Sequence, residues 1–157
     1  MPYVAVNNGF DEVYLCINSP GGWVGDGVFL YNYIRGLPIK VTMHNLGSIS
    51  SIAFSVFVAA AERYCSPHAI FMIHPTTLGP FQEGLPAERL QTALNAALAD
   101  DQRTENILRE RTSLPNEVLS AKRVRDFHIL PAQALQWGLV QGVRDFTLPQ
   151  GTEVIQI

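Results

Sequence analysis

The segment GSISSIAFSVFVAAAERYCSPHAIFMIH, from Gly47 to His74, decides the fold class of this chain. It begins with a glycine and small hydroxyl residues and continues as an apolar stretch with helical character. After a Ser-Pro turn it ends in a short hydrophobic strand before His74. A serine at a helix start and a histidine at a strand end are two parts of a serine hydrolase, because imidazole can take the proton of a nearby hydroxyl. The segment therefore predicts a hydrolytic site, on condition that folding brings the two side chains together.

The flanking sequence predicts alternating strands and helices. Apolar runs bounded by turn residues indicate strands, and apolar residues spaced three and four apart indicate amphipathic helices. In chain order we predict a strand over 13–18, a helix over 24–34, a strand over 39–46, a helix over about 51–61, and extended segments over 63–65 and 69–73. This order is typical of an α/β fold with parallel strands joined by helical crossovers.

The pattern changes after His74. Residues 75–85 are rich in Gly, Pro and Thr and predict a loop or an irregular strand, and a long helix follows from Pro86 to about Arg111. A helix of about 26 residues is roughly 39 Å long, so we expect it to project and to pack on a partner. Shorter helices near 116–124 and 131–137 and a last strand around Val143 complete the prediction.

Length and composition exclude several classes of protein. The 157 residues suit one domain with a substantial core. Charged residues make up only 16%, which predicts apolar surface buried between subunits. The net charge of −3 argues against a nucleic-acid partner, and no apolar stretch is long enough to span a membrane. Two cysteines make neither a disulfide framework nor a metal site, which suits a protein of the reducing cytoplasm.

The choice of serine stays open on the residues alone. Ser48, Ser50, Ser51 and Ser55 all lie near the predicted helix start, where capping or packing is the commoner role of a serine. Ser51 follows Gly47 by four residues, which leaves room for a tight turn. Among the four histidines, His74 alone ends an apolar strand, and reactive groups gather at the carboxyl ends of strands in parallel sheets.

Three further residues complete a candidate site. Ile52 would present a backbone N–H beside Ser51, and Gly22 would let a second backbone N–H approach a substrate. Two such donors directed at one point form an oxyanion hole. Asp126 would hold the tautomer of His74, although a lone aspartate is more often a solvated or capping carboxylate.

Five ordered segments resemble the proteolytic subunit of the Clp protease. They are INSPGG at 17–22, the G-x-x-x-S element at 47–51, MIH at 72–74, RDF at 125–127 and A-x-x-W-G-L-V at 134–140. The match extends roughly from Val13 to Val143, at nearly the spacings of the family. The resemblance implies Ser51 as nucleophile, His74 as general base, Asp126 as orienting carboxylate, and Gly22 and Ile52 as oxyanion donors, with no metal or cofactor.

The resemblance also implies an architecture. It is an α/β fold, the crotonase-like (Clp protease-type) β-β-α spiral with a projecting handle helix. A single domain over 1–157 would comprise a head of approximately 1–75 and 112–157 and a handle of approximately 76–111, and the N-terminal part of the family domain would be missing. The implied partners are further copies in one ring or two stacked rings, an ATP-driven unfoldase, and an unfolded protein or peptide substrate hydrolysed by the Ser-His-Asp triad.

Departures from the family pattern keep two other functions open. Ile49-Ser50 and Ile52-Ala53 replace the usual small pair and Met-Gly around the serine, which leaves Ser50 as a rival nucleophile. HNLGSISSI at 44–52 resembles divergent Clp-like proteins instead. One alternative is a catalytically weak scaffold or regulatory subunit. The other is a crotonase-type acyl-CoA enzyme, which shares the fold and the paired N–H groups.

Overall fold

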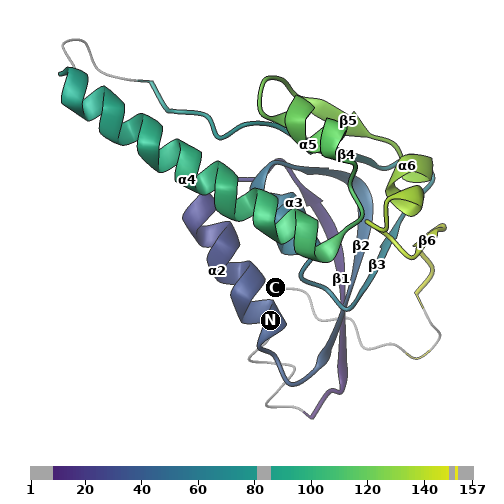
Figure 1. Cartoon of the computed structure of the whole chain (residues 1–157). Helices are drawn as coiled ribbons and strands as arrows, with labels where there is room; N and C mark the ends of the chain where they lie inside the picture. The colour runs from purple at the N-terminus through teal and green to yellow at the C-terminus, as the bar shows by residue number, and fades with distance from the viewer. Residues whose placement is uncertain (1–8, 81–85, 149–150, 152–157) are drawn as a thin grey trace.

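The computed structural model describes residues 9–80, 86–148 and 151 of the chain. Figure 1 shows its strands and helices in space. In chain order they are β1 (Glu12–Ser19), α2 (Val24–Arg35), β2 (Lys40–Ser50), α3 (Ile52–Phe57), β3 (Glu62–Cys65), β4 (Ile70–Ile73), α4 (Ala87–Arg111), α5 (Asn116–Lys122), β5 (Phe127–Ile129), α6 (Pro131–Gln136) and β6 (Gly142–Val143). Each predicted strand and helix is present, and the mixed α/β class is confirmed.

Strand β2 organises the six-stranded sheet. Its first half lies between β1 and β3, and Ser48–Ser50 in its second half pair with β4, all in parallel. Strand β6 extends the sheet beyond β3 in parallel, and β5 adds to β4 in antiparallel orientation. Because β2 and β4 are neighbours at their carboxyl ends, the residues that follow them start from one edge of the sheet.

Gly47 forms a bulge in β2 instead of the predicted turn. The pairing with β1 shifts register between Ile17 and Ser19, and the Asn18 side-chain oxygen accepts a hydrogen bond from the Ser48 N–H at 2.9 Å. A Cβ on Gly47 would lie 2.8 Å from that oxygen, so the close approach of Asn18 requires glycine. The bulge lets β2 continue to Ser50 and delivers Ser51 at the end of the strand.

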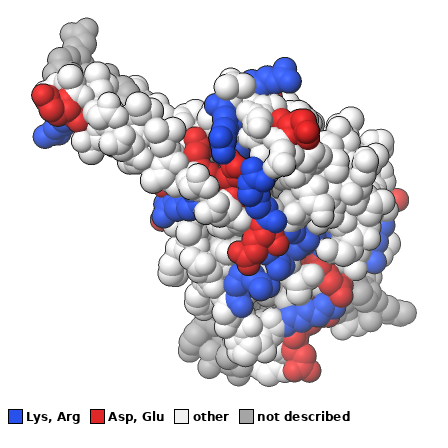
Figure 2. All heavy atoms as spheres, in the orientation of Figure 1, with Lys and Arg blue, Asp and Glu red and all other residues white. Residues whose placement is uncertain are grey.

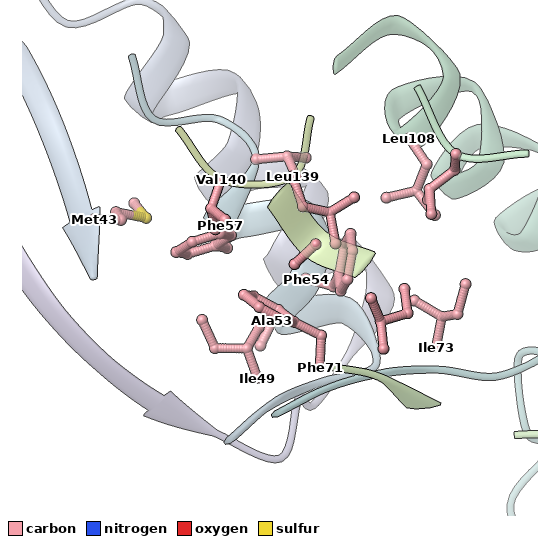
Figure 3. Packing of buried hydrophobic residues seen from close by; sticks show 14 of the residues in the cluster. Met43, Ile49, Ala53, Phe54, Phe57, Phe71, Ile73, Leu108, Leu139 and Val140 are labelled. Carbon is pink, nitrogen blue, oxygen red and sulfur yellow. The ribbon is translucent and has the colours of Figure 1, made fainter. Parts of the chain in front are cut away.

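Helix α3 is shorter than the predicted helix and is buried in the core. It ends at Phe57 because the following residues turn back to the sheet, where the Ala61 N–H donates to the Val41 carbonyl at 2.9 Å. Figure 3 shows Phe54 and Phe57 beside Phe71 of β4, with ring centroids 5.6 and 5.3 Å from the Phe71 ring. This packing fixes the helix that begins directly after Ser51.

Helix α4 projects as one long helix, as predicted (Figure 1), and its exposed apolar residues include Leu90, Leu94 and Leu98. Figure 2 shows charged side chains gathered over the base of this helix and α5, while most of the projecting part is uncharged.

Strand β5 is not in the prediction, because three residues are too few for an alternating pattern to show.

His44 is fully buried in β2 and bridges three segments. Its Nδ1 lies 2.9 Å from the Tyr14 hydroxyl, its Nε2 lies 3.4 Å from the Ser66 hydroxyl, and its ring packs edge-on against Phe146. Burial lowers the pKa of His44 and outweighs a hydrogen bond to the backbone of Arg144 that raises it. The imidazole is therefore a neutral part of the sheet.

We expect this histidine to make the protein less stable in mild acid. Its pKa returns to about 6.5 on unfolding, so the unfolded chain binds more protons below that pH, and the free energy of unfolding falls as the pH decreases. Urea unfolding at pH 7.5 and 5.5 measures this loss, which should be smaller in a His44→Gln variant. Equal losses in the two proteins would contradict the assignment.

Candidate active site

Ser51 occupies a strained turn between β2 and α3. Its backbone angles are φ 59° and ψ −135°. It is the one non-glycine residue with a positive φ in the described part of the chain. The Ser51 N–H donates to the Met72 carbonyl of β4 at 2.8 Å, so the turn is fixed against the neighbouring strand. Such strain costs on the order of 1–3 kcal/mol and concentrates at functional sites. A sharp strand-to-helix turn of this kind exposes a nucleophile.

Gly21 supports this turn from the opposite side, and sequence reasoning missed its role. It has a φ of +104°, and a Cβ there would lie 2.7 Å from the Cβ of Ser51 and 2.9 Å from the carbonyl oxygen of Ser50. Its backbone therefore packs directly against the serine. The signal in the sequence was the double glycine of INSPGG, in which only the second glycine was assigned a role.

Gly21→Ala is expected to lower the free energy of unfolding by about 2–4 kcal/mol, because it combines positive φ with overpacking against Ser51. Gly22→Ala is the matched control. A Cβ at Gly22 meets no atom within 4 Å, so the change should cost less than about 1 kcal/mol. Urea denaturation of the two variants measures the difference, and equal costs would show that Gly21 is not packed as described.

Ser51 and His74 line one cavity, with a volume of about 570 Å³. Gly22 and Ile52, the predicted oxyanion donors, line it as well. Ile52 is the first residue of α3, where a backbone N–H has no acceptor within the helix. Its side chain is fixed by Gly27 of α2, since a Cβ on that glycine would overlap the Ile52 side chain. Four of the five predicted site residues therefore surround one space.

The fifth, Asp126, directly precedes β5, the strand that pairs with β4, and lies outside the cavity lining. Strands β4 and β5 pair Phe71 with Ile129 and Ile73 with Phe127. His74 directly follows β4 and Asp126 directly precedes β5, so the two residues would oppose each other if the antiparallel ladder extended by one pair. Asp126 is exposed, and the described residues show no hydrogen bond that joins its carboxylate to His74 or His74 to Ser51. The structure thus places Ser51 and His74 on one cavity and places Asp126 directly before β5, outside that cavity lining.

Ser50, the rival nucleophile, is directed elsewhere. It is buried at the end of β2, its hydroxyl lies 3.3 Å from that of Ser48, and it does not line the cavity. Ser55 does line the cavity but is buried within α3.

Sequence reasoning also missed a charged group in the cavity wall. Thr76, Asp101 and Lys122 line the same cavity as Ser51 and His74, although they come from three separate parts of the chain. The Asp101 carboxylate accepts hydrogen bonds from both other residues. No pattern in the sequence could have linked them, because the helix positions of Asp101 and Lys122 resemble those of solvated charges.

Comparison with known proteins gives a family match over most of the chain. A family model described as Clp protease matches residues 1–146. The chain is 32% identical over 145 residues to ATP-dependent Clp protease proteolytic subunit 2 of Pseudomonas aeruginosa, which covers 88% of this chain and 71% of the relative. It is 30% identical over 142 residues to the ATP-dependent Clp protease proteolytic subunit of Helianthus annuus, with 89% and 71% covered. Within the described residues, no helix is both long enough and apolar enough to cross a membrane.

Proposed function

The chain belongs to the Clp protease family and is by that membership a serine protease, and from this premise we propose that Ser51, His74 and Asp126 form its catalytic triad. The substrate is an unfolded protein or a peptide, and the reaction is hydrolysis of a peptide bond. The observation that carries the proposal is the cavity shared by Ser51, on its strained turn, and His74.

The proposed chemistry uses side chains and backbone of this chain alone. Ser51 Oγ attacks the carbonyl carbon of the substrate while His74 takes the hydroxyl proton, and the N–H groups of Gly22 and Ile52 donate to the oxyanion. His74 then returns the proton to the leaving amine. In the second half, His74 removes a proton from water, which attacks the acyl carbon, and His74 returns that proton to Ser51 Oγ as the C–O bond breaks and the carboxylic acid product leaves.

Asp126 has the orienting role in this proposal. A carboxylate beside the imidazole holds its tautomer and stabilises the imidazolium that forms during the reaction. The β4–β5 register supports the assignment, because it makes Asp126 the residue opposite His74 if the ladder extends by one pair. Hydrogen bonds in unliganded active sites are often long and tighten when substrate binds.

We further propose a ring-forming homo-oligomer that works with an ATP-driven unfoldase in the cytoplasm. The head comprises approximately residues 1–75 and 112–157, and α4 belongs to a handle of approximately 76–111. The names of both relatives support ATP dependence. Exposed apolar side chains support the burial of two surfaces between subunits. One surface is on α4, and the other is on α2 and the residue before it, with the side chains of Trp23, Phe29, Leu30 and Tyr33. The free cysteines suit a reducing compartment.

Hydrolysis of a fluorogenic peptide and of an unfolded protein by the purified, assembled chain tests this function. We expect turnover of the peptide that a fluorophosphonate inhibits irreversibly. A protein that assembles but neither turns over peptide nor reacts with the fluorophosphonate would favour the scaffold function instead. Calorimetric binding of an acyl-CoA, without peptide turnover, would favour the crotonase-type alternative.

A further inference from the structure

Three donors converge on one oxygen of Asp101. The Thr76 N–H donates to Asp101 Oδ1 at 2.9 Å, the Thr76 hydroxyl donates at 3.0 Å, and the Lys122 ammonium donates at 3.1 Å. We call this group of three residues the Asp101 clamp. It joins the segment after β4, the middle of α4 and the last residue of α5 at a single carboxylate.

The clamp is too buried to be an ordinary surface ion pair. The Lys122 side chain is 5% exposed and that of Asp101 is 20% exposed. A buried ammonium without a partner is costly, so the lysine and the carboxylate hold each other in place. Burial alone would raise the pKa of Asp101, but the hydrogen bonds from Thr76 and Lys122 outweigh it and lower that pKa. Asp101 is therefore a charged acceptor over the working pH range of most proteins.

The two arms of the clamp lead to His74, which follows β4, and to Asp126, which precedes its antiparallel partner β5. Thr76 comes two residues after His74, and Lys122 comes four residues before Asp126. Nothing else in the described part of the chain links α4 to both of these segments through one side chain, and all three clamp residues line the cavity with Ser51. A shift of the carboxylate would move both arms together.

We propose that Asp101 is a positioning residue, which holds the segments of His74 and Asp126 in the register that catalysis needs. This inference rests on the proposed protease function. Within the described residues the hydrogen bonds of the Asp101 side chain go to Thr76 and Lys122 and not to Ser51 or His74, so Asp101 acts through those two partners. Because Asp101 is part of the projecting helix α4, the clamp also makes the arrangement of the site depend on how the base of that helix sits on the head.

Kinetics of clamp variants in the assembled protein test the inference. Asp101→Leu removes the acceptor and should lower kcat for a fluorogenic peptide by about 100-fold, with KM changed less than about threefold, since a small misplacement of catalytic groups has this effect. Asp101→Asn keeps an oxygen for Thr76 and should recover part of kcat. Glu117→Gln, which removes an exposed carboxylate from α5, is the matched control and should keep the wild-type kcat.

A charge exchange separates positioning from simple stabilisation. The double variant Asp101→Lys/Lys122→Asp restores opposite charges but removes the acceptor next to Thr76. The shorter aspartate at 122 does not replace it. We expect the melting temperature of this variant to rise above that of Asp101→Leu while its kcat stays low. The inference is overturned if the exchange restores kcat together with stability, or if Asp101→Leu retains the wild-type kcat. A wild-type protein without peptide turnover would instead overturn the proposed function, and the clamp with it.

Discussion

Ser51→Ala is expected to abolish peptide hydrolysis, with a fall in kcat on the order of 10⁴-fold or more. Alanine removes the attacking oxygen and leaves the cavity, the oxyanion donors and His74 in place. Because Ser51 is held with positive φ by its bond to Met72 and by contact with Gly21, the fold does not depend on its hydroxyl. The variant should therefore assemble normally and bind peptide without turning it over.

Ser50→Ala is the matched control for this prediction. Its hydroxyl is directed to Ser48 and lies outside the cavity lining, so its loss should change kcat by less than about threefold and should cost at most about 1 kcal/mol of stability. Steady-state kinetics with one fluorogenic peptide compares the two variants. Activity lost in Ser50→Ala and retained in Ser51→Ala would reverse the assignment of the nucleophile.

His74→Ala is expected to have an effect of similar size on kcat, on the order of 10³-fold or more, because nothing then removes the proton from the Ser51 hydroxyl. The effect on KM should be small, since an alanine at this position leaves the apolar wall of the cavity intact. Rates measured from single turnovers with excess enzyme isolate the acylation step in which the loss should appear.

His128→Ala controls for the loss of any histidine near the site. His128 is exposed on β5, where it pairs with Met72 of β4. It is therefore a close neighbour of His74 in the sheet but lies outside the cavity lining. Wild-type turnover is expected in this variant. Equal losses in both histidine variants would mean that the sheet edge, and not the His74 imidazole, limits the reaction.

Most of the fold was predictable because its elements have strong local patterns. The strand before INSPGG, the amphipathic α2 and the long α4 each show their period over enough residues to be recognised. The errors have specific physical causes. Gly47 was taken for a turn, but its missing Cβ makes room for Asn18, a contact 29 residues away in sequence. The helix after Ser51 was predicted too long, since its last turn is replaced by a bond from Ala61 to β2.

The candidate site was predictable only in part. Ser51, His74, Gly22 and Ile52 could be chosen because each stands at an end of a strand or helix, where the pattern changes, and because the family resemblance ordered them. Gly21 and Asp101 could not, since their roles come from contacts made after folding. Gly21 differs from Gly22 only in what its missing Cβ would meet. The role of Asp126 stays a prediction.

The central claim is that His74 activates Ser51 as the nucleophile. The most direct test is to treat the assembled protein with a fluorophosphonate and to identify the modified residue by mass spectrometry of its peptides. We expect a single adduct on Ser51, formed at least about 100-fold more slowly in His74→Ala. An adduct on Ser50, or an adduct on Ser51 that forms at the same rate without His74, would contradict the account.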